Sequence, residues 1–213
     1  LPVPVSLDVR GWSEMHPLNG PAWSLFFEYV ANILYAVLIR KFTSRWLAVL
    51  VFLAGCALIH QCYTQGNNIG GWTLDAEQCR VGLTRLMFPF FGGLLLFRLC
   101  KPGRIRHGFW WCSLLLVGAL AAPHVGGAEN FRLNGLYDAF CIIVIFPAVV
   151  FLGASDIPGD ISARASRFLG NISYPLYITH YPIVYLYLAW VHDAEVPLSR
   201  AVSYTHLTLP TKL

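Results

Sequence analysis

Four polar side chains share one face of a strongly apolar stretch near the start of the chain. Residues 21–42 read PAWSLFFEYVANILYAVLIRKF, long enough for a helix to cross the hydrocarbon core of a bilayer. Its polar groups recur at i, i+4, i+8 and i+11, which a helix places on one face: Ser24, Glu28, Asn32 and Tyr35. An ionisable group at membrane depth is costly and normally faces a bundle interior or a water-filled cavity. We therefore expect Glu28 to line a polar cavity and to have a partner there.

A second polar stripe lies in residues 168–191, where Ser173, Tyr177 and His180 follow at i, i+4 and i+7. Pro175 and Pro182 interrupt the same stretch and can free backbone carbonyls that then need a polar neighbour. An imidazole titrates near neutral pH, so His180 is a candidate base. The alternative is a histidine that is hydrogen-bonded inside the bundle.

The composition places these stripes in a membrane protein. Of 213 residues, 56% are hydrophobic and 12% are charged, whereas soluble proteins have about 25% charged residues. The mean hydropathy is +0.57. The net charge of +4 requires no nucleic-acid partner, because the basic residues lie between apolar segments. Six cysteines lack metal-ligand spacing, so we expect no metal site.

The pattern predicts an all-α, polytopic transmembrane bundle of about six helices. The expected helices are residues 21–42, 46–63, 83–100, 108–123, 136–153 and 168–191. Residues 1–20 are expected to form a loop on the outer side and residues 21–191 the bundle. Residues 192–213 are expected to be a non-native or disordered tail.

Lysine and arginine are concentrated in the loops that follow the first, third and fifth helices, near residues 43, 103 and 160, so these loops should be cytoplasmic. With that orientation Glu28, Arg85 and Asp138 all lie in the outer halves of their helices. We expect a cavity walled by the first, third, fifth and sixth helices, with Arg85 as the first choice of partner for Glu28.

Three segments resemble one family. NGPAWSLFFEY, with Trp23, Ser24 and Glu28, resembles the WSLxxE signature of the membrane acyltransferase 3 family. FLGNISYPLYITHYPIV resembles the family's late LGxISYxLYxxHxP helix, and RLMFPFFGGLLLFRL is similar to its RxxxFxxGxL helix. The resemblance implies a multi-pass protein of the bacterial cytoplasmic membrane. It also implies transfer of an acyl group, usually acetyl from acyl-CoA, to hydroxyls of a surface glycan, exopolysaccharide or lipid-linked saccharide.

The chain departs from that family at defined places. The family's proposed catalytic histidine follows an Arg or Lys by eleven positions in the first helix, and no pair here has that spacing. The family usually has about ten helices, so the resemblance implies a C-terminal portion that is inert alone. Tyr29 stands where many members have a second Glu, and residues 203–213, SYTHLTLPTKL, look like a translated sequencing adapter.

The resemblance and the polar stripes give candidate roles. Glu28 and His180 are the catalytic candidates, and the substrate-binding candidates are Trp23, Ser24, Asn32, Arg85, Tyr174 and Tyr177. No cofactor is expected to stay bound; acyl-CoA is the co-substrate, and membrane lipids and a glycan are the partners. Basic residues 98–106 could contact the CoA phosphates, although positive-inside topology explains them without a ligand.

Each role has a structural alternative. Glu28 and Arg85 can form an ion pair that joins two helices, Ser24 can form a hydrogen bond between helices rather than act as a nucleophile, and the tyrosines can be packing residues. A transporter or flippase with a polar path through Glu28, Arg85 and His180 is the alternative function.

Cys62 and Cys79 flank the same expected outer loop. If that side is oxidising, a disulfide could close a loop of fewer than 20 residues and contribute about 3 kcal/mol.

Overall fold

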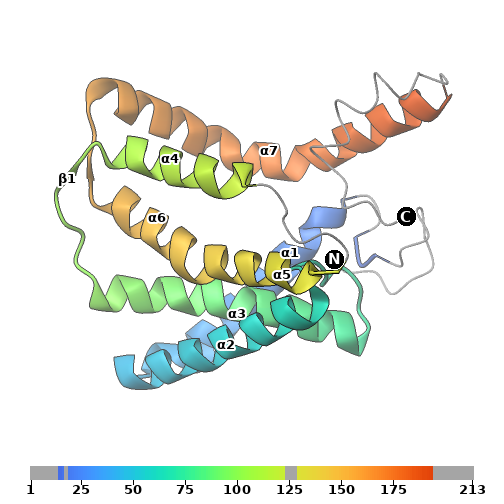
Figure 1. Cartoon of the computed structure of the whole chain (residues 1–213), viewed down its shortest axis with the longest axis horizontal. Helices are drawn as coiled ribbons and strands as arrows, with labels where there is room; N and C mark the ends of the chain where they lie inside the picture. The colour runs from blue at the N-terminus through green and yellow to red at the C-terminus, as the bar shows by residue number, and fades with distance from the viewer. Residues whose placement is uncertain (1–13, 17–18, 123–128, 194–213) are drawn as a thin grey trace.

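The protein is an all-α bundle, as the sequence predicts. The computed structural model describes residues 14–16, 19–122 and 129–193 (Figure 1). The helices are α1 (Trp23–Val37), α2 (Ser44–Gln65), α3 (Ala76–Leu99), α4 (Gly108–Ala121), α5 (Phe131–Phe140), α6 (Phe146–Ala154) and α7 (Asp160–Asp193). Short 3-10 turns flank α1, η1 (Gly20–Ala22) and η2 (Ile39–Lys41), and a π-helical turn, η3 (Cys141–Ile145), joins α5 to α6. Because α5, η3 and α6 are continuous, the described residues contain six helical spans.

The spans differ in how well they suit a bilayer. Among the described residues, three are long and apolar enough to cross a membrane: Ser44–Gln65, Ala76–Leu99 and Phe131–Ala154. The apolar helix α4 has 14 residues and α1 has 15, whereas α7 runs for 34. The third span begins at Ala76 rather than residue 83, and the last begins at Asp160 rather than residue 168.

Capping residues set the boundaries of α2 and α3. The Thr43 hydroxyl accepts a hydrogen bond from the Trp46 amide at 3.4 Å, and α2 ends at Gly66, whose φ of 72° favours glycine. Asp75 caps α3 by accepting from the Gln78 amide at 2.9 Å. A hydrogen bond from the Thr73 hydroxyl, and then the one from the Gln78 amide, lower the pKa of the Asp75 carboxyl. The early start of α3 thus has a local cause in the sequence.

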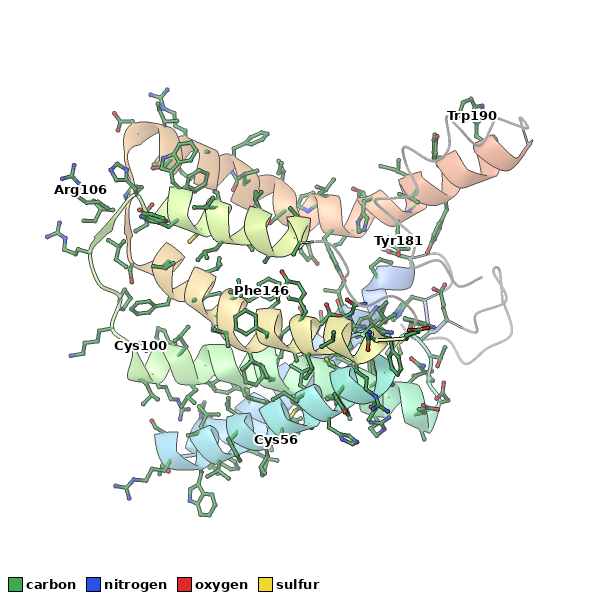
Figure 2. All side chains as sticks on the ribbon, in the orientation of Figure 1. Cys56, Cys100, Arg106, Phe146, Tyr181 and Trp190 are labelled. Carbon is green, nitrogen blue, oxygen red and sulfur yellow. The ribbon has the colours of Figure 1, made fainter. Side chains whose placement is uncertain are left out.

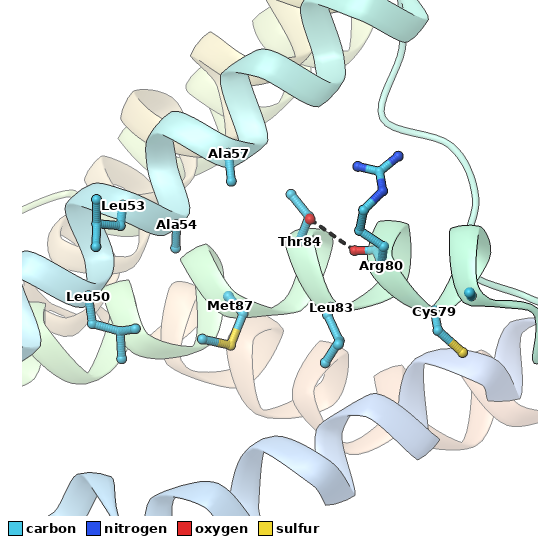
Figure 3. Close-up of a pocket in the computed structure, with 10 residues that line it drawn as sticks. Leu50, Leu53, Ala54, Ala57, Cys79, Arg80, Leu83, Thr84 and Met87 are labelled. Atoms are coloured by element: carbon cyan, nitrogen blue, oxygen red, sulfur yellow. Dashed lines mark hydrogen bonds between the residues drawn. The ribbon is translucent and has the colours of Figure 1, made fainter.

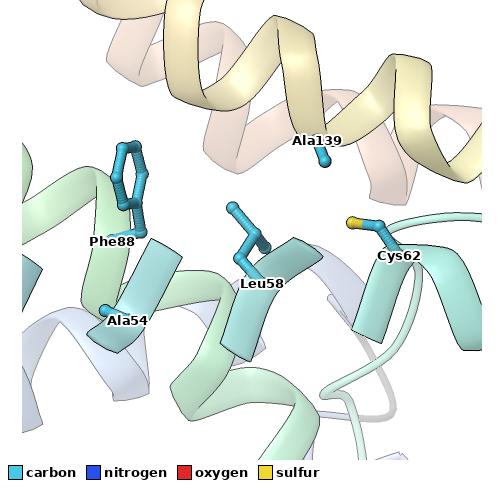
Figure 4. Close-up of a cluster of buried hydrophobic side chains, with 5 residues drawn as sticks. All are labelled: Ala54, Leu58, Cys62, Phe88 and Ala139. Carbon is cyan, nitrogen blue, oxygen red and sulfur yellow. The ribbon is translucent and has the colours of Figure 1, made fainter. Parts of the chain in front are cut away.

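Helix α2 makes the most extensive packing in the bundle, against α3 and α5 (Figure 4). The buried cluster there consists of Ala54, Leu58, Cys62, Phe88 and Ala139. Small residues allow the helices to approach closely: a Cβ on Gly135 of α5 would lie 1.9 Å from the Cys62 carbonyl oxygen. In contrast, α7 is mostly exposed, and its described packing is on η1.

The outside of the bundle is covered with apolar side chains (Figure 2). Phe52 on α2 is 69% exposed, Leu120 on α4 is 76% exposed and Trp190 on α7 is 58% exposed. So many exposed large apolar side chains are typical of a protein surrounded by hydrocarbon.

Hydrogen bonds gather the basic loops at one end of the bundle, which we call the basic end (left in Figure 1). Arg98 Nη1 donates to the Phe42 carbonyl at 2.7 Å, and the Gly103 amide donates to Ser155 Oγ at 2.9 Å. Two short strands pair there in parallel, β1 (Ile105–Arg106) with β2 (Asp156–Ile157). The predicted grouping of the loops near residues 43, 103 and 160 is confirmed.

The loops at the other end, which we call the cavity end, also contact one another. The Met15 amide donates to the Trp72 carbonyl at 2.8 Å, and the Asn68 amide donates to Asp138 Oδ2 at 3.1 Å. The alternation of loops between two ends therefore follows the prediction, while the assignment of the basic end to the cytoplasm stays a prediction.

The predicted Cys62–Cys79 disulfide is wrong, because both thiols are free. Cys62 is buried against α5 near Ala139, whereas Cys79 Sγ lies 3.9 Å from the Thr73 carbonyl oxygen. Cys62 and Cys79 flank the same loop, but they lie on different helices, α2 and α3, and their side chains point to different neighbours.

The close approach at Gly135 predicts a specific packing cost. Gly135→Ala should lower the free energy of unfolding in detergent by about 2–3 kcal/mol, because either α2 or α5 must shift. Gly93→Ala, in the interior of α3 with nothing within 4 Å of its Cβ position, is the matched control. It should be neutral or stabilising by up to about 1 kcal/mol. Equal thermal midpoints for the two variants would contradict this account.

Topology can be tested by thiol labelling in intact cells. A cysteine at exposed Lys101, at the basic end, should resist a membrane-impermeant maleimide, whereas one at exposed Glu129, at the cavity end, should react. The parent chain gives the background from its own cysteines. Labelling at residue 101 with protection at residue 129 would invert the orientation.

Candidate functional site

A cavity of about 730 Å³ extends from the cavity end toward the middle of the bundle. It lies between α1, α3 and the η3–α6 segment, with one residue from α7. Its lining comprises Trp23, Ser24, Phe27, Glu28, Asn68, Gly82, Arg85, Leu86, Pro89, Phe90, Ile142, Phe146 and Tyr177. Five of the eight candidate residues from the sequence therefore meet in one place.

Two glycines let α1 approach α3 at this cavity. A Cβ on Gly82 would lie 2.4 Å from the Phe27 ring, so only glycine fits between the helices there. Gly71, with φ of 99°, would bring a Cβ within 3.0 Å of the Trp23 ring. The loop before α3 and the start of α1 are thereby held against each other, which places Trp23 over the cavity.

Arg85 is held in the cavity wall by neutral partners. Its Nη1 donates to the Gly70 carbonyl oxygen, and its guanidinium carbon lies 4.5 Å from the centre of the Trp23 ring, a cation–π contact. Within the described part of the chain no ion pair joins Arg85 to Glu28 or Asp138. The expected Glu28–Arg85 pair is therefore wrong: the guanidinium lies against the loop carbonyl and the indole instead.

Glu28 presents its carboxylate at the cavity wall. Its side chain is exposed and, among the described residues, has no hydrogen-bond or ion-pair partner. A carboxylate and a guanidinium that share a cavity without neutralising each other can each act on a third group.

Ser24 and Tyr177 join α1 to α7 by a directed pair of hydrogen bonds. The Tyr177 hydroxyl donates to the Pro21 carbonyl at 2.7 Å, and its oxygen lies 2.6 Å from Ser24 Oγ. Because the single phenolic proton goes to a carbonyl, Ser24 must be the donor in the second bond. The Ser24 hydroxyl therefore donates its proton to a phenol oxygen, which is only weakly basic and does not activate the serine. This favours a structural role for Ser24 over a nucleophilic one.

A proline-freed carbonyl gives α7 a third attachment. Pro182 has no N–H, so the carbonyl of Ile178 lacks its helical partner. Asn19 Nδ2 donates to that oxygen at 3.0 Å, across 159 residues of sequence. The expectation that the prolines of this helix require a polar neighbour is confirmed at this position.

His180 lies one turn beyond Tyr177 on α7, outside the cavity lining. Its Nδ1 lies 2.8 Å from the Tyr177 carbonyl oxygen and 3.0 Å from that of Leu176. Because both partners are acceptors, Nδ1 carries the proton, and the neutral ring has an unprotonated Nε2. The imidazole is oriented by its own helix, and Nε2 is available to accept a proton.

Two other candidates lie away from the cavity. Asn32 is exposed and donates to the carbonyl of Glu28 at 2.9 Å in its own helix, and Tyr174 is 60% exposed. Tyr35, the last member of the first polar stripe, packs against the buried pair Leu47 and Phe91. The polar stripe on α1 therefore extends along the helix beyond the cavity, and only Ser24 and Glu28 of its four residues line it.

Asn68 is a cavity residue that the sequence did not single out. It lines the cavity, its amide donates to Asp138, and its Oδ1 is buried without a partner. It lies in a polar loop, where an asparagine carries no periodic signal. Within the described ranges, no three His, Cys, Asp or Glu side chains gather to hold a metal ion.

The fold and the cavity together define a multi-pass membrane protein with a charged pocket between its helices. The family model of the acyltransferase domain, acyltransferase 3, matches residues 1–211, and the chain belongs to this family. The protein is therefore an integral membrane acyltransferase rather than the alternative transporter. No match was found among curated proteins or solved structures. The match extends to residue 211. Residues 194–213 lie outside the described residues, so the expected non-native character of residues 192–213 stays a prediction.

The bonds around Tyr177 predict an energetic coupling between α1 and α7. In a double-mutant cycle for thermal unfolding, Ser24→Ala and Tyr177→Phe should be coupled by about 1 kcal/mol, because each removes the same hydrogen bond. Tyr174→Phe, at an exposed tyrosine on the same helix, is the control partner and should show no coupling with Ser24→Ala. Additive effects in the first cycle would rule out the contact.

Proposed function

We propose that this enzyme transfers an acyl group, acetyl in the first instance, from acyl-CoA to a hydroxyl of a surface glycan, an exopolysaccharide or a lipid-linked saccharide. We place it in the bacterial cytoplasmic membrane. The observation that carries the proposal is the cavity at the cavity end, which Glu28 of α1 and Arg85 of α3 both line without pairing. Such a cavity suits a neutral, hydroxyl-bearing acceptor better than a charged one.

The chemistry assigns each group a part. The acceptor hydroxyl oxygen attacks the thioester carbonyl carbon, a new C–O bond forms, and the C–S bond breaks to release the CoA thiolate. The hydroxyl proton must go to a base, and Glu28 is the carboxylate in the cavity wall that can take it. The proton then returns to the leaving thiolate, so that atoms and charge balance.

Arg85 is the proposed stabiliser of the negative charge that develops on the carbonyl oxygen. Its position is fixed by the Gly70 carbonyl and the Trp23 ring, so it does not have to reorganise during the reaction. Trp23 is then a positioning residue for Arg85. Tyr177 and Ser24 hold the wall opposite through their mutual hydrogen bond.

His180 is the second candidate base. Its Nε2 is the unprotonated nitrogen, but its side chain lies outside the lining, next to the ring of Tyr177 at a centroid separation of 6.0 Å. To act directly it must reach the acceptor from beyond Tyr177. Glu28 is therefore the first candidate. Asn32 and Tyr174 remain predicted substrate contacts that would act outside the cavity.

The donor is proposed to bind from the basic end. Lys101, Arg104 and Arg106 are exposed there and can contact the phosphates of CoA. Arg98, at that end of α3, is 13 residues from Arg85, which is about 20 Å along a helix. The nucleotide and the reacting carbonyl would therefore lie at opposite ends of the bundle, joined by the extended pantetheine arm.

The sequence predicts that this chain is inert alone, so the test uses the full-length protein. There Glu28→Gln should lower acyl transfer by about 10²–10⁴-fold, the usual contribution of a general base. Surface glycans of cells with and without the full-length gene are compared by mass spectrometry for added acyl groups, and initial rates are measured in isolated membranes with acyl-CoA. Glu129→Gln is the matched control, since Glu129 is an exposed carboxylate at the cavity end and outside the cavity.

The two variants should insert equally, as judged by the amount of folded protein in the membrane fraction. A Glu28→Gln enzyme with the activity of the unaltered enzyme would remove Glu28 as the base and leave His180. Glycans without any acyl group that depends on the gene would overturn the proposed acceptor.

A further inference from the structure

A second hollow, of about 480 Å³, lies between α2 and α3 and shares no residue with the cavity that holds Arg85 (Figure 3). Small side chains create it: Ala54 and Ala57 on α2 leave space that Leu83 and Met87 of α3 border. Both helices are among those long and apolar enough to cross a membrane. We call this hollow the α2–α3 groove.

The α2–α3 groove is polar only near the cavity end. Arg80 lies there, four residues into α3, and its guanidinium has no partner within the described part of the chain. One turn deeper, the Thr84 hydroxyl donates to the Arg80 carbonyl at 2.9 Å, so its proton is already used. Beyond Thr84 the lining is aliphatic down to Leu50 and Met87.

A free carboxylate stands one turn further out than Arg80. Glu77 is exposed, and among the described residues its side chain makes no hydrogen bond or ion pair. Its acidic neighbour Asp75 is engaged by Thr73 and the Gln78 amide. Glu77 and Arg80 are three residues apart on α3, which puts them on the same face with an axial separation of about 4.5 Å.

This order of charges matches one kind of lipid. From the surface inward along α3 there is an anion, Glu77, which is not one of the lining residues, then a cation, Arg80, in the lining, and then the apolar lining of the groove. A phospholipid with a primary ammonium headgroup offers a cation, a phosphate and then an acyl chain. We propose that the α2–α3 groove binds phosphatidylethanolamine, with its phosphate on Arg80, its ammonium on Glu77 and one acyl chain along Leu83 and Met87.

The same geometry disfavours other common lipids. Phosphatidylglycerol has no ammonium group, so Glu77 would be left facing an anionic headgroup. Phosphatidylcholine has a trimethylated nitrogen without an N–H donor, and it forfeits the hydrogen bond to the Glu77 carboxylate. The site is therefore selective for headgroup chemistry as well as for an acyl chain.

Lipid retention measured by native mass spectrometry tests the proposal. The full chain is reconstituted in nanodiscs with equal amounts of phosphatidylethanolamine, phosphatidylglycerol and phosphatidylcholine, then released in detergent, and the lipids that remain bound are counted. The unaltered protein should retain one phosphatidylethanolamine, favoured about fivefold over either competitor, the scale of an exposed ion pair.

Three variants separate the contacts. Arg80→Gln should lower retention of phosphatidylethanolamine about fivefold, and Glu77→Gln should abolish its advantage over phosphatidylglycerol. Ala57→Phe fills the groove and should reduce retention of every lipid; Ala57 is exposed, so the larger ring does not enter the buried cluster. Arg132→Gln, at an exposed arginine of the cavity end outside the groove, is the matched control and should not change retention.

Equal retention of the three lipids by the unaltered protein would show ordinary annular lipid and overturn the proposal. The same follows if Arg80→Gln retains as much phosphatidylethanolamine as Arg132→Gln. Both substitutions are at exposed positions, so this comparison decides the question even if Ala57→Phe does not fold. The measurement does not involve acyl transfer. The result of the lipid-retention experiment is therefore independent of the proposed enzymatic function.

Discussion

The positive charge of Arg85 at membrane depth constrains the cavity end more than any other single group. A guanidinium in this position must be satisfied by the protein around it, because the hydrocarbon core of the bilayer offers no compensating partners. Here the Gly70 carbonyl and the Trp23 ring supply that compensation. Both partners depend on Gly71 and Gly82, which allow the loop and the start of α1 to approach α3. The cavity shape therefore follows from how one charge is accommodated.

As a consequence, the Glu28 carboxylate is not paired with the Arg85 guanidinium, although both residues line the cavity. An ion pair between Glu28 and Arg85 would join two helices, but neither charged group would then be available to a substrate. By using a neutral carbonyl and an aromatic face, the protein keeps the guanidinium in place and leaves the carboxylate at the wall available. This separation makes the cavity suitable for acyl transfer, in which a proton and a developing negative charge must be handled at different atoms.

The helices around α2 and the helix α7 are attached to the bundle by different kinds of interaction. Around α2 the helices interlock through small residues, and Gly135 approaches the backbone of α2 at a distance that admits no side chain. Helix α7 instead meets the start of α1 through hydrogen bonds, from Asn19 to Ile178 and around Tyr177. Polar attachment lets one helix contribute to the cavity without extensive apolar packing.

The sequence by itself determined the helical class, the alternation of loops between two ends, and five residues that line the cavity. These features are encoded locally: apolar length defines a span, a period of 3.6 residues defines a face, and basic loops share an end. It also determined that Pro182 would leave a carbonyl to be satisfied, because proline lacks an N–H wherever it stands. Only the tertiary structure decided the partners. The rotation of α3 and the path of the loop before it place the Arg85 guanidinium against the Gly70 carbonyl and the Trp23 ring rather than beside Glu28. The same loop places Asn68 in the cavity lining. The thiols of Cys62 and Cys79 stay unbonded because the two residues lie on different helices. Those outcomes depend on contacts between distant segments, which a helical period in one segment does not contain.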